Sequence, residues 1–452
     1  FSPNSNFMHI AIIGNGISGI TAARYIRKLS EHKITVISSE SDHFFSRTAL
    51  MYIYMGHMRF EDTKPYEDWF WEKNRINLKK GFVKKVNHQD NEILFTKGEK
   101  MKYDKLILAT GSASNKFGWP GQDLEAVHGM YSLQDLEAME KYSEGLKCAV
   151  IVGGGLIGIE MAEMFHSRNI PVTFLVRETD FWNGVLPIEE SKMVGRHISK
   201  NHIDLQLATE LKEIVDDGNG KACAVITSKG ERIECGFVGL TAGVHPNIDF
   251  LKDSGIEIQR GIVVNDFLET NIPNIYAIGD CAQMQNPKPG RRPVEAIWYT
   301  GRMMGETVAY NVCDKKVAYD PGIWFNSAKF FEIEYQVYGT VLAKMADNHE
   351  AVYWEHADGR KSIRVIFDKN TEEIVGFNLM GVRFRHEVCE KWLKEKTIVE
   401  VVLQDLAIAN FDPEFYKSHE HEVLNIYNQK SGKNLTPKKK RGWTQAFNFL
   451  NS

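Results

Sequence analysis

The chain has 452 residues, of which 55 are basic and 59 acidic, so the formal net charge is −4. This length predicts about two to four domains, and the balanced charge gives no reason to expect nucleic acid or an anionic membrane as the main partner. No stretch reaches the roughly 18 consecutive apolar residues of a membrane span.

Six cysteines are spread along the chain, at positions 148, 223, 235, 281, 313 and 389. No two of them stand at C-x-x-C or similarly close spacing, so the pattern favours neither a disulfide scaffold, nor a zinc cage, nor a local redox pair. The N-terminal residues lack the basic and apolar regions of a signal peptide. We therefore expect a reducing, cytoplasmic setting and no metal.

The first predicted unit begins with "HIAII", an apolar run typical of a buried parallel strand. Gly14, Gly16 and Gly19 follow as G-x-G-x-x-G, then a helical segment and a second strand, "KITVIS". The first glycine suits the tight turn, the second lets a pyrophosphate approach the backbone, and the third lets the helix pack on the strand. This context predicts dinucleotide binding, and a ligand-free strand–helix turn is the alternative.

An acidic residue normally ends the second strand of such a unit and binds a ribose hydroxyl. Ser38 and Ser39 come first here, and Glu40 is the nearest acid. Glu40 is therefore the candidate, with an ordinary solvated carboxylate as the alternative.

The same design occurs a second time, in "KCAVIVGGGLIGIEMAEMF", followed by the strand "PVTFLV". Each unit continues into a polar, hairpin-rich stretch and closes with an apolar strand and a small-residue turn, "KLILATGSAS" and "FVGLTAGVHP". The whole nucleotide-binding unit is therefore repeated, which indicates two dinucleotides and electron transfer between them. The residues assigned to the second nucleotide, NADPH or NADH, are Gly153, Gly155, Leu156, Ile157, Gly158 and Gly243.

Arg177 and Glu178 end the second strand of the second unit. A guanidinium suits the 2′-phosphate of NADPH, whereas Glu178 suits the 2′-hydroxyl of NADH. The sequence slightly favours NADPH, and a surface charge pair is the alternative.

The character of the chain changes after about residue 318. "KSIRVIFDKNTEEIVGFNLMG" alternates like two antiparallel strands around a turn at 368–371, and "FRHEVCEKWLKEK" and "VEVVLQDLAIA" predict helices. The tail 431–452 contains a basic run, Lys438 to Arg441, followed by aromatic residues. A solvated end is the plain interpretation, and contact with a membrane surface or an acidic partner is the alternative.

Two glycine triplets, "ILATG" and "YAIGD", in this order and spacing, resemble the FAD-dependent pyridine nucleotide–disulfide oxidoreductase family. The resemblance covers residues 8 to about 315 and extends plausibly to about 430. It implies an α/β fold with two Rossmann-like, three-layer ββα domains and a C-terminal α+β interface domain. The implied FAD domain comprises 8–115 and 245–318, with the NAD(P)H domain 116–244 inserted and the interface domain, usually dimeric in the family, at 319–430.

The resemblance also implies site residues. Asp280 would bind the ribityl chain of FAD, Arg47 would lie near the flavin, Glu160 near the nicotinamide, and Trp298 either at the flavin edge or in the core. The remaining FAD residues carried over are Asn15, Ile17, Ser18, Val83, Ala109, Thr110, Gly111 and Gly279.

The chain departs from the family pattern at three places. It has no cysteine before Cys148, so the thiol chemistry of the disulfide reductases lacks its nucleophile, and Cys281 is interpreted as a small buried residue. Tyr52 replaces a lysine that pairs with the acid matching Glu160, which makes Tyr52 and Glu160 the uncertain catalytic candidates. His419, Glu420 and His421 do not match the family's His-Glu pair and predict a solvated surface, with a metal site as the alternative.

These features resemble the branch without redox cysteines: ferredoxin and rubredoxin reductases and the flavin part of nitrite reductases. We expect an FAD-dependent NAD(P)H oxidoreductase that passes electrons directly to a small iron–sulfur or other redox protein, and that forms a homodimer. One alternative is an NAD(P)H oxidase that uses oxygen. The other is a flavin-gated binding protein resembling apoptosis-inducing factor.

Overall fold

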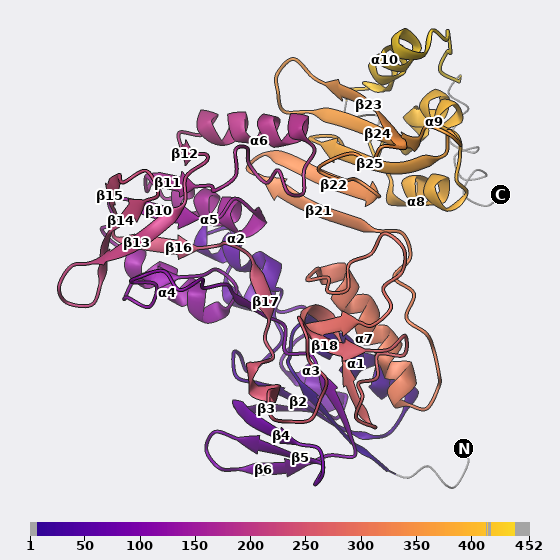
Figure 1. Cartoon of the computed structure of the whole chain (residues 1–452). Coiled ribbons are helices and arrows are strands. Elements are labelled where there is room, and N and C mark those ends of the chain that lie inside the picture. Colours follow the sequence, from indigo (N-terminus) through magenta and orange to yellow (C-terminus); the bar gives the residue numbers. More distant parts are fainter. Residues whose placement is uncertain (1–6, 413, 415–416, 439–452) are drawn as a thin grey trace.

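The structure is a computed structural model that describes residues 7–412, 414 and 417–438. Figure 1 shows three bodies: a sheet with α1 and α7, a second sheet with α4 and α5, and a C-terminal sheet with α8, α9 and α10. Most of the predicted tail, including the basic residues after Lys438, lies outside the described residues. Lys438 itself donates from Nζ to Asp405 Oδ2 at 2.5 Å.

The first body is built on a five-stranded parallel sheet in the order β19-β7-β1-β2-β3. Its central strand β1 is almost fully buried, as an all-apolar strand covered on both faces should be. The strands are β1 (His9–Ile13), β2 (Lys33–Ser38), β3 (Ile76–Lys80), β7 (Lys105–Leu108) and β19 (Ile275–Ala277). Residues around 275 thus return to the sheet that residue 9 begins, as predicted.

Two helices, α1 (Ile17–Leu29) and α7 (Trp298–Val312), pack side by side on this sheet. Their close approach depends on Gly305, where a Cβ would stand 2.5 Å from the carbonyl oxygen of Ser18. The rest of this body consists of short helices and small sheets: α2 (Leu50–Tyr54), α3 (Trp69–Lys73), β4 (Val83–Asn87), β5 (Glu92–Phe95), β6 (Lys100–Lys102), β18 (Ile262–Val264) and β20 (Ala282–Met284).

The second body repeats the design with the sheet order β12-β11-β10-β16-β9. Its strands are β9 (Val127–His128), β10 (Ala149–Val152), β11 (Val172–Leu175), β12 (Asp204–Gln206) and β16 (Phe237–Leu240). Its helices are α4 (Leu133–Ser143), α5 (Leu156–Ser167) and α6 (Ile188–Lys200), and its antiparallel sheet comprises β13 (Leu211–Asp216), β14 (Ala222–Thr227) and β15 (Arg232–Glu234). The predicted fold class, two Rossmann-like units, is confirmed.

Two short strands connect the first and second bodies, β8 (Ser112–Ser114) and β17 (Val244–Pro246), which pair antiparallel to each other. The chain leaves the first body along β8 and comes back along β17. This arrangement agrees with an inserted second unit, whereas the exact domain boundaries stay predictions.

The C-terminal body is a five-stranded antiparallel sheet in the order β21-β22-β25-β24-β23. The predicted hairpin and both predicted helices are present. The elements are β21 (Phe325–Phe330), β22 (Ile333–Gly339), β23 (His349–Glu355), β24 (Ser362–Asp368), β25 (Ile374–Met380), α8 (His386–Lys394), α9 (Val399–Asp405) and α10 (Glu420–Ser431).

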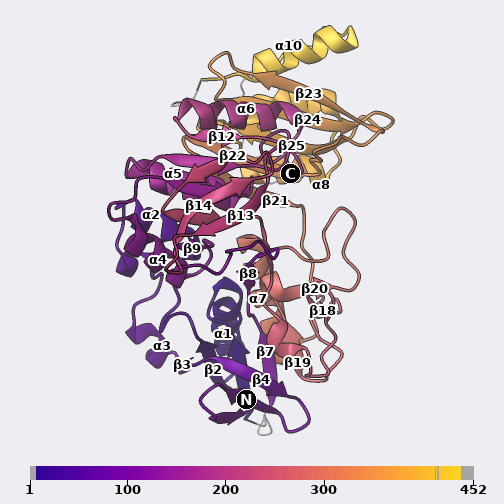
Figure 2. The same cartoon turned by 60° about the vertical axis from the view of Figure 1, so that its left-hand side comes forward.

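Both faces of this C-terminal sheet are covered within the chain. One face packs on α8, α9 and α10, and α6 of the second body lies along the other face in both views (Figures 1 and 2). The α6 contact is polar as well as apolar, because Arg364 of β24 donates to Glu190 of α6 at 2.7 and 2.9 Å. A dimer would therefore use the edge strands or the outer helix surfaces.

The predicted solvated surface at residues 419–421 is wrong for its first two members. His419 and Glu420 are buried, and only His421 is exposed. The ring of His419 stacks on Trp354 with centroids 4.5 Å apart, so an apolar partner on β23 explains the burial.

Within the described residues, no His, Cys, Asp or Glu side chains gather in a group of three that could hold a metal ion. All six cysteines are free thiols, and Cys281 is fully buried, as predicted. No described helix has the length and apolar character needed to cross a membrane.

Candidate functional site

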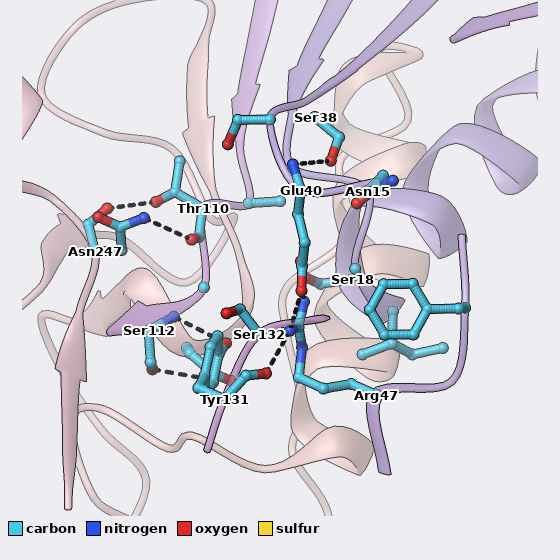
Figure 3. A pocket seen from close by; sticks show the side chains of 18 of the residues that line it. Asn15, Ser18, Ser38, Glu40, Arg47, Thr110, Ser112, Tyr131, Ser132 and Asn247 are labelled. Atoms are coloured by element: carbon cyan, nitrogen blue, oxygen red, sulfur yellow. Dashed lines mark hydrogen bonds and ion pairs between the residues drawn. The ribbon is translucent and has the colours of Figure 1, made fainter. Parts of the chain in front are cut away.

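A cavity of about 670 Å³ opens where β1, β2 and β7 end at their carboxyl edge. This is the edge at which parallel α/β sheets bind ligands. The structure brings most of the predicted residues together on its walls (Figure 3). These are Gly14, Asn15, Gly16, Ile17, Ser18, Glu40, Arg47, Val83, Ala109, Thr110, Gly111, Leu156, Ile157, Glu160, Asp280 and Trp298.

The three glycines of the first loop have different physical tasks. A Cβ at Gly14 would stand 1.9 Å from the carbonyl oxygen of Ala109, and one at Gly19 would stand 2.0 Å from that of Gly14. A Cβ at Gly16 would meet no atom within 4 Å. Gly14 and Gly19 thus serve backbone packing, whereas Gly16 faces open space at the start of α1, where a helix N-terminus favours a phosphate. The loop fits a pyrophosphate.

Glu40 does not present a free carboxylate to this cavity. It accepts hydrogen bonds from Arg47 Nη1 at 2.7 Å, from Arg47 Nη2 at 2.6 Å and from the backbone N–H of Leu133 at 2.9 Å. Ser39, which is exposed and lines the cavity, stands closer to the end of β2. The ribose role of Glu40 stays a prediction, and Ser39 is a second candidate that the search for an acid overlooked.

Asp280 lies in a polar network on the opposite wall of the cavity (Figure 3). Its Oδ2 accepts from the hydroxyl of Ser112 at 3.0 Å and from that of Tyr131 at 3.3 Å, and the N–H of Ser112 donates to the Tyr131 oxygen at 3.0 Å. Burial raises the pKa of Asp280, and the two hydroxyl donors oppose that rise. An acid placed this way can accept from ribityl hydroxyls.

Ser112 and Tyr131 were missed by sequence reasoning. Ser112 directly follows the predicted turn Thr110-Gly111, so its position was a usable signal. Tyr131 precedes the capping box of α4, in which Ser132 accepts from the N–H of Asp135 at 3.1 Å. That box fixes the start of the helix and with it the place of the tyrosine.

Thr110 is held by a crossover residue that the sequence analysis also missed. The Thr110 hydroxyl donates to the carbonyl oxygen of Asn247 at 2.8 Å, and the Asn247 amide donates back to the Thr110 carbonyl at 3.4 Å. Both residues line the cavity. The returning chain therefore fixes the turn after β7.

The second body contributes the first residues of α5 to the same cavity. Leu156, Ile157 and Glu160 line it, which brings the second unit against the first. Burial, followed by the nearby charge of Glu163, raises the pKa of Glu160 to about 7. Glu160 is thus a wall residue able to hold or release a proton near neutral pH.

Tyr52 does not line this cavity. Its ring stacks on His57, with centroids 6.1 Å apart, whereas Leu50 and Met51 of the same helix face the cavity. The short helix α2 turns position 52 away. The expectation that Tyr52 lies near the flavin is therefore not supported by its placement.

The second glycine loop repeats the division of tasks. A Cβ at Gly153 would stand 2.6 Å from Thr241 backbone atoms and one at Gly158 2.4 Å from the Gly153 oxygen, whereas one at Gly155 would meet only Trp182 Nε1 at 3.8 Å. Gly155 therefore matches Gly16. Gly243 has φ +84°, a conformation that favours glycine, at the start of the return along β17.

Arg177 and Glu178 are bound to each other. Arg177 Nη2 donates to Glu178 Oε1 at 2.9 Å, and the arginine side chain is 71% exposed. The alternative of a surface charge pair thus describes the structure, and the role of either residue in nucleotide selection stays a prediction.

A family model described as pyridine nucleotide-disulphide oxidoreductase matches residues 8–305, about two thirds of the chain. The chain belongs to this family. It is 30% identical over 352 residues to an NADH oxidase of Methanocaldococcus jannaschii, which covers 75% of this chain and 78% of that protein.

Two further proteins show how far the likeness extends. The electron transfer subunit of the assimilatory nitrate reductase of Bacillus subtilis is 25% identical over 394 residues, 86% of this chain, and the chain spans half the length of that protein. A structure titled as the covalent putidaredoxin reductase–putidaredoxin complex has a TM-score of 0.77 at 19% identity, covering 95% of this chain and 100% of that chain. This second likeness concerns the fold.

Family membership identifies the two nucleotides as FAD and NAD(P)H, and the glycine loops fit them. The family name refers to a disulfide, yet the cavity walls contain no cysteine among the described residues. Their sulfur atoms belong to Met51, Met130 and Met164. This member of the pyridine nucleotide-disulphide oxidoreductases has no thiol at its site.

Proposed function

We propose that the chain is an FAD-dependent NAD(P)H oxidoreductase that passes electrons directly to a small redox protein, without a redox-active disulfide. The observation that carries this proposal is the thiol-free cavity on which Gly16, Asp280 and Glu160 converge. When bound, the flavin accepts hydride from the nicotinamide and can release electrons singly.

The chain's own residues have four tasks in this proposal. The open space at Gly16 and the N-terminus of α1 receive the pyrophosphate, and Asp280 orients the ribityl chain with the help of Ser112 and Tyr131. Leu156 and Ile157 form the wall that separates the ring system from water. Glu160 is able to hold a proton beside it near neutral pH.

Trp298 supports an exit for electrons at the rim of the cavity. It begins α7, lines the cavity and is 38% exposed, so its ring reaches both the site and solvent. A carrier docked there would come close to the bound flavin. A carrier of this kind stands in the name of the putidaredoxin complex, and electron transfer in that of the nitrate reductase subunit.

An NADH oxidase is the second candidate function, and the Methanocaldococcus relative favours it. A flavin-gated binding protein is the third. Anaerobic stopped-flow separates the three. Fast reduction by NAD(P)H followed by fast reoxidation with rubredoxin or ferredoxin supports the reductase. Reoxidation by oxygen alone supports the oxidase, and a long-lived reduced complex that neither reoxidises supports the switch.

We also propose a reducing, cytoplasmic location, because all six cysteines are free thiols in the structure. A homodimer stays a proposal. Sedimentation of the purified protein over a range of concentrations tests it, since a monomer at all concentrations would exclude a stable dimer.

A further inference from the structure

Three cysteines of the second body lie close together although they are far apart in the sequence. Cys223 lies in β14, Cys235 directly follows β15, and Cys148 directly precedes β10. The backbone N–H of Gly236 donates to the carbonyl oxygen of Cys148 at 3.0 Å, which brings the end of the hairpin to the start of β10. Sequence spacing favoured no local redox pair; the fold creates one.

The register of the hairpin sets Cys223 against Cys235. The strands β14 and β15 pair Ala224 with Glu234 and Val225 with Ile233. One step further along the same register, the N–H of Cys235 donates to the carbonyl oxygen of Cys223 at 3.0 Å. Opposite residues of an antiparallel pair project from the same face, so both thiols lie on one side of the hairpin.

This position is compatible with a disulfide, though not an ideal one. Opposite residues in a hydrogen-bonded pair have Cα atoms about 5.5 Å apart, inside the range of about 4.4–6.8 Å for disulfides. Their Cβ atoms are about 4.5–5.5 Å apart, whereas a disulfide requires about 3.5–4.5 Å. The strands must therefore draw together slightly, and such a bond is more easily reduced than a relaxed one.

The two thiols have different surroundings. Cys223 is partly exposed, and Arg232 Nη2 lies 3.9 Å from its sulfur. Cys235 is buried in the core of the second body, and burial, with the thiols of Cys148 and Cys223 next, raises the pKa of Cys235 to about 12. A reagent from solvent therefore meets Cys223 first.

We propose that Cys223 and Cys235 are a reversible thiol-modification site that closes to a disulfide on reaction with a small-molecule disulfide. The Cys223 thiolate attacks one sulfur of the reagent, forming a mixed disulfide and releasing one thiolate. Cys235, once deprotonated, attacks the Cys223 sulfur, forming the cross-strand bond and releasing the second thiolate. The two protons lost pass to the released thiolates, and the reagent gains the two electrons that the cysteines lose.

The site is separate from the flavin cavity, because neither Cys223 nor Cys235 lines that cavity. The reaction therefore needs neither nucleotide, and its outcome does not depend on the proposed function. Cys148 is the third thiol of the cluster and the competing partner for Cys235.

The test uses the full-length nucleotide-loaded protein, reduced, freed of reductant and incubated with oxidised glutathione. We expect two of the six thiols to disappear, the mass to fall by two hydrogens, and dithiothreitol to restore both. Peptide mapping should recover Cys223 linked to Cys235. C223S and C235S should each abolish this product, whereas C313S, which changes a partly exposed cysteine elsewhere, should retain it.

Three results would overturn the proposal: six unchanged thiols, glutathione that stays on Cys223 in the unchanged protein, or a bridge between Cys148 and Cys235. Mapping of the unchanged protein gives each of these answers. The proposal is therefore open to refutation even where a serine variant does not fold.

Discussion

Arg47 grips Glu40 with both guanidinium nitrogens, at 2.7 and 2.6 Å, and the same arginine donates to the carbonyl oxygen of Tyr131 at 2.6 Å. Glu40 also accepts from the first N–H of α4. The pair thus fastens the loop after β2 to the start of the second body, across one side of the cavity (Figure 3).

Arg47→Lys should destabilise the protein by about 1.5–3 kcal/mol, because lysine cannot make the two-pronged contact and also reach Tyr131. The Arg47–Glu40 side chains are only 29% and 17% exposed, whereas those of Arg177–Glu178 are 71% and 35% exposed. Arg177→Lys is therefore the matched control, with a change below about 0.5 kcal/mol. Urea unfolding of both variants measures the difference, and equal effects would show that the clasp contributes nothing.

Gly16→Ala should leave the fold intact and weaken flavin binding, because its Cβ meets only open space in the protein. The backbone at Gly16 has φ −70°, which alanine adopts readily. Gly14→Ala should instead cost about 3 kcal/mol or more, since its Cβ would collide with Ala109. Thermal melts and retained flavin absorbance separate the two effects. A Gly16→Ala protein that keeps its flavin would place the pyrophosphate elsewhere.

The stability of the nucleotide-free protein should depend on Glu160 between about pH 5 and 8. Its pKa in the folded chain is about 7, above the ordinary value of 4.5, because burial favours the neutral acid. This contribution is complete below the unfolded pKa and is lost as the pH rises through about 7. Glu160→Gln stays neutral, so its advantage over glutamate should grow to about 3 kcal/mol above pH 8. A difference that stays constant with pH would contradict the raised pKa.

Arg177→Ala should raise KM for NADPH more than for NADH if the guanidinium grips the 2′-phosphate. The ion pair with Glu178 competes for that guanidinium, so Glu178→Ala should lower KM for NADPH. Steady-state kinetics with both nucleotides measure these changes. Equal effects on the two nucleotides would discard the preference for NADPH.

The two nucleotide-binding units were predictable because their signal is local. A buried strand, a glycine loop and a helix follow one another within about 20 residues, and each glycine answers a steric demand of its neighbours. The C-terminal hairpin was predictable for the same reason, since alternation and a polar turn define it within one short segment.

The misses concern partners that are distant in the sequence. Nothing beside Glu40 indicates that Leu133 and Arg47 occupy its carboxylate, and nothing beside His419 indicates that Trp354 covers its ring. Cys223 and Cys235 are 12 positions apart and become neighbours only through the register of β14 and β15. Side-chain pairing of this kind depends on the assembled fold rather than on local pattern.

An anaerobic titration of the yellow, dithiothreitol-reduced and desalted protein with NAD(P)H tests the central claim most directly. Without a thiol at the site, one equivalent of NAD(P)H should bleach the flavin band completely, and adding rubredoxin or ferredoxin should restore it with the free-thiol count unchanged. Consumption of a second equivalent with the appearance of new thiols, or a colourless protein that takes up no flavin, would contradict the account.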